Sequence, residues 1–220
     1  MTPRGIMVHS TGANNPNLWR YVQPDDGLIG VNRHGNSFNE FHPGGRQVCA
    51  HAFIGRKKDG GIATYQIMPW NWEAWHSGKG RHGSAWRMGY IGFEICEDGL
   101  TDRDYFKAVY REAVELCAYL CGMFGLDPVK DIICHSEGYV KGIASAHADV
   151  MHWFPQHGKS MDIFRADVQK EMCKRKEPDM DELKVRQIVD DELLKGTVVY
   201  ETLQEVPAWG RETVKKLVDK

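Results

Sequence analysis

The chain has 220 residues, a formal net charge of −2 and a hydrophobic content of 42%. That length suits one domain of ordinary size with a short appendage, and the apolar content is sufficient for a buried core. The near-neutral charge argues against nucleic acid or an acidic membrane surface as a partner. No apolar run in the sequence approaches the ~20 residues that a membrane span requires, so we expect no membrane partner.

The first predicted element is a short buried strand over residues 5–8, GIMV, with His9 directly after it. The residues before it lack the long apolar segment of a secretory signal, which predicts a protein made in the cytoplasm without a signal peptide. Residues 12–46 are rich in Gly, Asn, Pro and Asp and show little periodicity. A stretch of this kind predicts a long surface loop with one helical turn.

An antiparallel hairpin is predicted over residues 47–70, where two alternating runs flank a Lys-Lys-Asp-Gly-Gly turn. A Gly- and Trp-rich crossing follows over residues 70–89 and contains the sequence AWHSG. Residues 90–96 are predicted to form the next strand, with Glu94 inside it. Because side chains alternate along a strand, Glu94 is expected on the face opposite to its apolar neighbours Phe93 and Ile95.

The second half of the chain predicts two amphipathic helices. The first begins after a cap at Thr101, which has Asp104 three residues on, and it ends before Gly125. Residues 132–134 predict a further strand, after which the chain is expected to form a loop. The second helix covers residues 160–173 and is expected to pack on the sheet. Strands mixed with long helices indicate an α/β domain.

Two histidines follow apolar runs that lie far apart in the chain. His9 follows residues 5–8 and His135 follows residues 132–134, so both are expected at the carboxyl edge of buried strands. Asp149 offers a third donor, and this set suits zinc, which three protein ligands hold with a fourth position left for water. Zinc lowers the pKa of such a water to about 7, so hydrolysis is the predicted class of reaction.

The same regions offer the other groups that hydrolysis at zinc requires. Glu94 is the candidate acid/base, and His147 is the candidate donor to the developing negative charge. Residues two apart lie on the same side of an extended segment, so His147 and Asp149 are predicted to face one site.

Five sequence motifs occur in an order that is typical of a known family. They are VHSTG, AHAFIG with YQIMPW, AWHSG, IGFEIC and CHSEGY, within about residues 1 to 170. In this order they resemble the zinc-dependent N-acetylmuramoyl-L-alanine amidases of the peptidoglycan-recognition fold, particularly phage and prophage endolysins of Gram-positive bacteria. The resemblance implies a central mixed β-sheet flanked by helices. It also implies hydrolysis of the amide bond between N-acetylmuramic acid and the first L-alanine of the stem peptide.

The resemblance further implies roles for individual residues. His9 and His135 match the two histidine ligands of the family, and Glu94 matches the residue that activates the water. Many relatives carry Lys-x-Asp or Lys-x-Cys where this chain has His147-Ala148-Asp149. Because histidine titrates near ~6.5, an oxyanion contact from His147 would depend on pH. The interval from His135 to Asp149 is also longer than in compact relatives, so Asp149, His147 and His152 stay open as alternatives for the third ligand.

Four further residues near these motifs are candidates for contact with the substrate. His51 and His76 each lie in a motif, and the sequence favours substrate contact and structural hydrogen bonding equally for both. Trp70 and Trp72 lead into AWHSG, where tryptophan rings either stack on a sugar or fill a core.

The predicted domain organisation has three parts. Residues 1–172 form the zinc amidase catalytic domain, and residues 173–182 form a charged linker that contains KRKEPDMDE. Residues 183–220 are expected to form a short, truncated C-terminal module. It resembles segments appended to clostridial wall-lytic proteins, which suggests attachment to the cell wall, and a fragment of a linker is the alternative.

The leading functional hypothesis is a bacteriolytic amidase that takes a muramyl peptide as its substrate. Without a signal peptide, such a lysin is made in the cytoplasm and released to the wall. The first alternative is a binding module, because relatives that lack the full zinc set recognise peptidoglycan without cutting it. The second alternative is a zinc hydrolase of another amide bond. The presence of the expected ligands favours the enzyme.

Overall fold

The computed structural model describes residues 1–23, 25–35, 37–38 and 48–176. The predicted C-terminal module and most of the predicted linker lie outside the described residues. Within the described part of the chain, no helix combines the length and the apolar character that crossing a bilayer requires.

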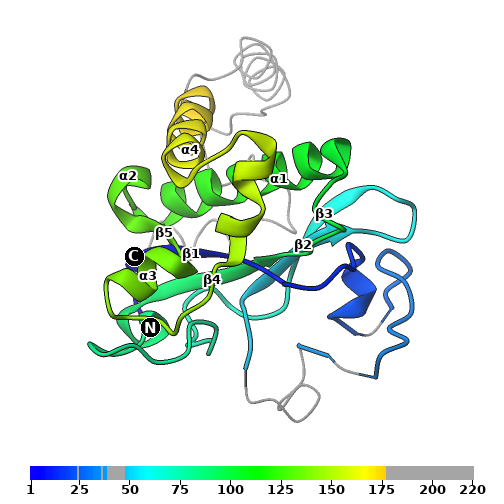
Figure 1. The fold of residues 1–220 in the computed structure, drawn as a ribbon, viewed down its shortest axis with the longest axis horizontal. Helices are drawn as coiled ribbons and strands as arrows, with labels where there is room; N and C mark the ends of the chain where they lie inside the picture. The colour runs from blue at the N-terminus through cyan, green and yellow to red at the C-terminus, as the bar shows by residue number, and fades with distance from the viewer. Residues whose placement is uncertain (24, 36, 39–47, 177–220) are drawn as a thin grey trace, which may run out of the picture. The chain divides into compact units, whose positions relative to one another are not determined.

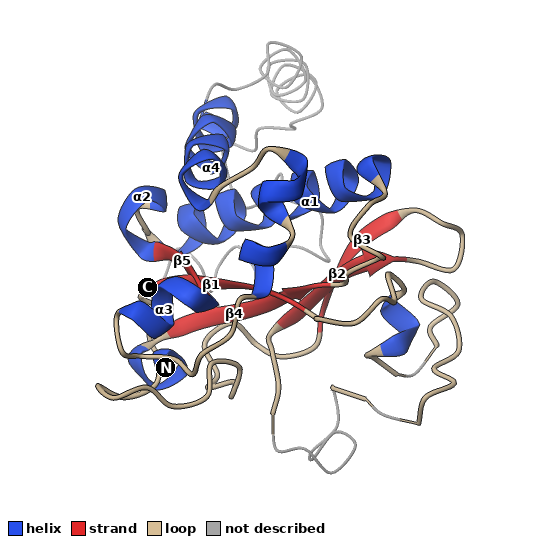
Figure 2. Cartoon of the chain, in the orientation of Figure 1, coloured by secondary structure: helices blue, strands red, loops and turns tan. Residues whose placement is uncertain are grey.

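A five-stranded mixed sheet forms the centre of the described domain, in the order β3-β2-β4-β1-β5. Strands β2 and β3 form the predicted antiparallel hairpin, while β4, β1 and β5 run parallel to one another and β2 runs parallel to β4 (Figure 2). The strands are β1 (Gly5–Ser10), β2 (Ala52–Arg56), β3 (Ile62–Gln66), β4 (Tyr90–Ile95) and β5 (Ile132–Cys134). The predicted α/β class with a central mixed sheet is confirmed.

The two faces of this sheet have different roles because side chains alternate along each strand. Ile6 and Val8 of β1 join Phe93 of β4 in the main hydrophobic core, beneath helix α1 (Arg103–Phe124). The residue after Val8, His9, is paired in register with Glu94, which follows Phe93, so both belong to the opposite face. The sheet therefore carries its core on one face and the candidate catalytic residues on the other.

Helices cover the core face of the sheet (Figure 1). Besides α1, they are α2 (Pro128–Asp131) and α4 (Met161–Lys176), with the short 3-10 turns η4 (Asp149–His152) and η5 (Phe154–His157). Helix α3 (His135–Val140) and the 3-10 turns η1 (Leu18–Arg20) and η3 (Ala85–Met88) pack instead on small apolar clusters of the other face, around Met7 and Phe53. Helix α4 packs mainly on α1 and α2 rather than on the sheet as predicted, because α1 already covers the strands. The hydroxyl of Tyr110 on α1 donates to Asp167 on α4 at 2.7 Å.

Helix α4 also continues to Lys176, into the segment that the sequence predicts as linker. Its last turns contain a Lys174–Glu171 ion pair at 3.1 Å, and Lys, Arg and Glu are good helix formers. Charge alone therefore does not mark the end of the helix.

The start of α1 differs by one residue from the prediction. The N-cap is Asp102 and not Thr101, because the carboxylate of Asp102 accepts hydrogen bonds from the backbone N–H groups of Asp104 and Tyr105, both at 3.0 Å. The far end agrees with the prediction, since Gly125 adopts a left-handed φ of 67° and ends the helix.

The described parts of residues 12–46 are more than a surface loop. The predicted helical turn is present as η1, but Leu18, Tyr21, Val22 and Ile29 are buried against Phe53 of β2. They form a second small core at the side of the sheet. The prediction of a surface loop is therefore wrong for this part of the segment, because its apolar side chains are buried against the sheet.

We predict that replacing Asp102 by Ala destabilises the protein by about 1 kcal/mol, the usual cost of losing an N-cap. The matched variant Thr101→Ala is expected to change the free energy of unfolding by less than about 0.5 kcal/mol, because Thr101 is exposed and does not cap the helix. Urea denaturation followed by circular dichroism measures both values. Equal losses in the two variants would contradict the assignment of the cap.

Candidate active site

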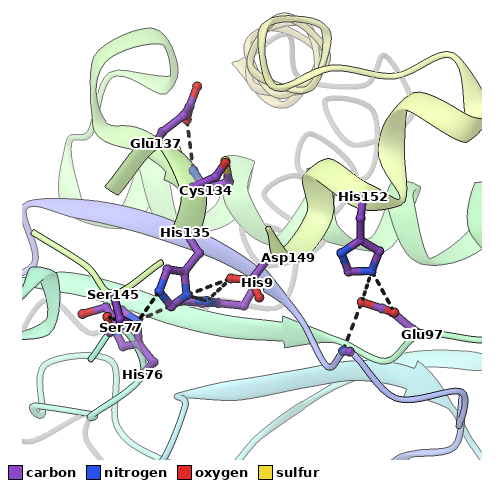
Figure 3. Close-up of polar contacts among 12 residues, drawn as sticks. His9, His76, Ser77, Glu97, Cys134, His135, Glu137, Ser145, Asp149 and His152 are labelled. Carbon is purple, nitrogen blue, oxygen red and sulfur yellow. Dashed lines mark hydrogen bonds and ion pairs between the residues drawn. The ribbon is translucent and has the colours of Figure 1, made fainter. Parts of the chain in front are cut away.

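Three side chains from distant parts of the chain meet at the end of the parallel strands (Figure 3). The Nδ1 atoms of His9 and His135 lie 3.1 Å apart, and Oδ2 of Asp149 lies 3.0 Å and 2.8 Å from them. Both histidines are buried, and the side chain of Asp149 is 13% exposed. The structure thus gathers the two histidines and the aspartate that the sequence proposed as ligands.

Strand pairing accounts for the meeting of the two histidines. Strand β5 pairs in parallel with β1, with Cys134 opposite Val8, so the next residue of each strand, His135 and His9, leaves the same edge of the sheet. His135 then begins helix α3, where the sequence predicted a loop.

Two residues that sequence reasoning missed hold the start of α3. A carboxylate oxygen of Glu137 accepts a hydrogen bond from the backbone N–H of Cys134 at 3.0 Å. Arg165 of α4 makes two hydrogen bonds to the same carboxylate, both at 3.0 Å, in the bidentate geometry that gives strong pairs. The three-residue spacing of Cys134 and Glu137 is that of a capping box and can be seen in the sequence. Arg165 lies too far along the chain for a local pattern to reveal its contact with Glu137.

The chain turns sharply where Asp149 enters the site. Ala148 has helical dihedral angles, and Asp149 has a left-handed φ of 46°, which few residues other than glycine adopt. The prediction that His147 and Asp149 alternate along an extended segment is therefore wrong. Both residues still line the same cavity, and the ring of His147 lies 4.8 Å from that of His135.

The alternatives for the third ligand occupy different positions. His152 turns away from the cluster toward Glu97, with its Nε2 at 3.0 Å from a carboxylate oxygen (Figure 3). Glu97 is buried and also accepts a hydrogen bond from the backbone N–H of Gly12. Of the three candidates, Asp149 is the one with an atom within hydrogen-bonding distance of both histidines.

Glu94 occupies a position that suits a proton acceptor. It lines the cavity, and its buried Oε2 has no hydrogen-bond partner among the residues that the structure describes. Burial, followed by repulsion from Asp149 and Glu97, raises the pKa of Glu94 well above its usual value. A carboxyl group with a raised pKa can exchange a proton near neutral pH.

The electrostatic balance of the cluster favours a bound cation. Burial lowers the pKa of His9, so its ring is neutral at pH 7. Burial opposes ionisation of Asp149, but the close contacts of its carboxylate with the rings of His135 and His9 outweigh that effect and keep the pKa of Asp149 below its usual value. Two imidazole nitrogens and one carboxylate oxygen form a donor set that zinc binds in proteins.

The spacing of the three donors also fits zinc. Metal–ligand distances of about 2.0–2.1 Å in a tetrahedral site place the ligand atoms about 3.3 Å apart. The three observed separations, from 2.8 to 3.1 Å, are shorter by only a few tenths of an ångström. Among the described residues, His9, His135 and Asp149 have donor atoms close enough together to hold one metal ion.

A cavity of about 600 Å³ opens in front of the cluster. Asp149, His135 and Glu94 lie in its wall together with His147 and His152. The apolar part of the wall consists of Tyr21, Phe38, Val48, Ala50, Phe53 and Trp75. The cavity therefore offers polar groups at the cluster and an apolar surface for the rest of a ligand.

The four candidates for substrate contact differ in their position relative to the cavity. His51 is fully buried, and both of its ring nitrogens are within hydrogen-bonding distance of backbone groups of Gly92 and Trp72. His76 lies in the cavity wall and contacts His9. Trp70 is partly buried against the main core, and Trp72 is 60% exposed outside this wall. Trp75, which the sequence did not separate from its neighbours, is the tryptophan in the wall.

Comparison with known proteins adds a family and a fold. The family model described as N-acetylmuramoyl-L-alanine amidase matches residues 1–153. The hydrolase AmiA of Staphylococcus aureus, solved in complex with its ligand, is 18% identical with a TM-score of 0.53, over 77% of this chain and 73% of AmiA. PlyL is 22% identical with a TM-score of 0.51, over 76% and 84%. At such identities these two structures support a shared fold. No curated protein matches the chain in sequence.

We predict that replacing Gly92 by Ala destabilises the metal-free protein by about 1–3 kcal/mol, the usual cost of overpacking. A Cβ at Gly92 would lie 2.3 Å from the ring of His76. The matched variant Gly122→Ala should stabilise the protein by about 0.5–1 kcal/mol, because Gly122 lies inside α1 with open space around it. Urea denaturation measures both. A neutral Gly92→Ala variant would show that the ring of His76 is free to move aside.

Proposed function

The chain belongs to the N-acetylmuramoyl-L-alanine amidase family, and from this we propose that it uses zinc to hydrolyse the bond between N-acetylmuramic acid and L-alanine in peptidoglycan. The observation that carries the proposal is the convergence of His9, His135 and Asp149 at a cavity whose wall contains His135, Asp149 and Glu94. A module that only bound peptidoglycan would have no use for this set of buried, mutually repelling and strained groups. The proposed place of action is the bacterial cell wall.

His9, His135 and Asp149 are the proposed zinc ligands. Zinc held by three protein ligands supplies a Lewis acid and an acidified water at its fourth position. The three ligands contribute one negative charge, so the site keeps a net positive charge with the ion bound. The left-handed backbone at Asp149 is consistent with a functional role, because such strain is typically found at active sites.

Glu94 is the proposed general base and then general acid. Its raised pKa and unpaired Oε2 leave the carboxylate ready to take the proton of the attacking water. The same proton can then pass to the leaving amine of L-alanine as the amide bond breaks. The pairing of Glu94 with His9 in neighbouring strands fixes its position relative to a ligand.

His147 is the proposed donor to the oxygen of the scissile carbonyl group. It lies in the cavity wall beside His135, where a ring N–H can point toward the charge that develops on that oxygen. Phe38, Phe53 and Trp75 in the apolar part of the wall are proposed to contact the lactyl methyl group or the faces of the sugar rings.

The main test of the proposed function is digestion of purified Gram-positive sacculi. We expect muropeptides with free lactyl groups and new N-terminal alanine by mass spectrometry, and we expect a zinc chelator to abolish both products. Appearance of neither product with zinc bound would contradict the proposal and favour a binding module. New amino termini other than alanine would favour hydrolysis of another amide bond.

We predict that Glu94→Gln lowers turnover by at least about 100-fold, the usual contribution of a general base, while zinc content stays at the wild-type level. The contrasting variant Asp149→Ala should lose both zinc and turnover, because it removes a ligand. Metal analysis and the rate of alanine release measure the two effects. Wild-type turnover in Glu94→Gln would exclude Glu94 as the base.

A further inference from the structure

We propose that the turn at residues 74–78 is a positioning element that holds both histidine ligands in the tautomer whose Nδ1 can bind zinc. The inference rests on the proposed zinc site and adds two residues to it, His76 and Ser145. Each of them binds the Nε2 atom of one ligand histidine, on the side of the ring away from Asp149.

The tautomer of His9 follows from a chain of hydrogen bonds that begins at a carbonyl group. His76 Nε2 lies 3.0 Å from the carbonyl oxygen of Tyr90, which can only accept, so Nε2 of His76 must donate. A neutral histidine ring carries one proton, and in His76 this proton is on Nε2, so Nδ1 is left as an acceptor. His9 Nε2, 2.9 Å away, must then donate to this atom. The proton of His9 is thus on Nε2, and its Nδ1 keeps a free lone pair.

The same reasoning assigns the tautomer of His135. The hydroxyl of Ser145 lies 3.3 Å from the backbone carbonyl of Ser77 and must donate its proton there. Its oxygen can then accept from Nε2 of His135, also at 3.3 Å. His135 therefore carries its proton on Nε2 and turns its Nδ1 toward His9 and Asp149. The side chain of His76 and the carbonyl of Ser77 are adjacent in the chain, so one turn serves both ligands.

Two glycines give this turn the room that it needs. A Cβ at Gly92 would lie 2.3 Å from the ring of His76, and a Cβ at Gly78 would lie 2.6 Å from the hydroxyl of Ser145. Gly78 also has a left-handed φ of 63°, which lets the chain turn back directly after Ser77. The glycines of the AWHSG and IGFEIC motifs thus allow the close approach of the two hydrogen-bonded side chains.

The test compares zinc affinity among variants of the full chain. Histidine, asparagine and leucine at position 76 form a matched series, because asparagine and leucine have the same shape and only asparagine places an oxygen near the position of Nδ1. We expect His76→Leu to bind zinc about 10–100-fold more weakly than wild type, the usual effect of losing a partner of a ligand histidine. His76→Asn should bind within about threefold of wild type, and Ser145→Ala should lose about 10-fold.

Competition with a fluorescent chelator measures the affinities, and circular dichroism of the metal-free proteins confirms that each variant is folded. As a second readout, the ring N–H proton of His9 in the zinc-loaded protein should exchange slowly with water in wild type and His76→Asn, and rapidly in His76→Leu. If His76→Leu does not fold, the smaller substitution Ser145→Ala still tests whether a partner of a ligand histidine affects zinc affinity.

The outcomes separate this inference from the proposed function. Equal zinc affinity in wild type, His76→Leu and Ser145→Ala would overturn the positioning role and leave the amidase proposal intact. An affinity of His76→Asn as low as that of His76→Leu would also overturn it, because shape rather than hydrogen bonding would then decide. Failure of the wild-type protein to bind zinc would instead overturn the proposed metal centre, and this inference with it.

Discussion

The site depends on one constraint, the parallel pairing of β1 between β4 and β5. This pairing places His9 next to Glu94 and directs His135 to the same edge of the sheet. Backbone hydrogen bonds and the core on the other face hold this pairing, so contacts among the site residues are not needed to set the positions of these strands. That separation matters, since the groups of the site are buried, desolvated and in part mutually repulsive. Burial of such polar groups costs stability, and the hydrophobic core beneath α1 offsets that cost.

Much of this arrangement could be predicted from the sequence because the strands are short, apolar and bounded by polar residues. The hairpin, the Glu94 strand and the two histidine strands all follow from alternation and from turn residues. The motif resemblance then implied that these strands form one central mixed sheet, which periodicity cannot give, while the order of the strands in that sheet was not predicted. The N-cap at Asp102 was missed by one residue, since Thr101 and Asp102 are both good caps and only the backbone path decides between them.

The rest of the site depended on information that no local pattern contains. Asp149 reaches the histidines through a left-handed turn, and nothing in the sequence around Ala148 distinguishes that turn from an extended segment. His152 and Glu97 pair over 55 positions of sequence, which directs His152 away from His9 and His135 in a way that only tertiary structure reveals. His51 and His76 looked equivalent in their motifs, yet His51 contacts backbone groups of Gly92 and Trp72 while His76 contacts the side chain of His9.

The contact of Arg165 with Glu137 shows that the folded domain depends on residues beyond the family match. The family match stops at residue 153, before α4 begins. Arg165 nevertheless reaches from α4 to the carbonyl of Ile132 and to the carboxylate that caps the helix carrying His135. A fragment cut at the boundary of the family match would leave Glu137 without its counter-ion and α1 without its covering helix. A fragment that keeps these contacts therefore includes α4, and fusion or truncation designs should place their junction beyond it.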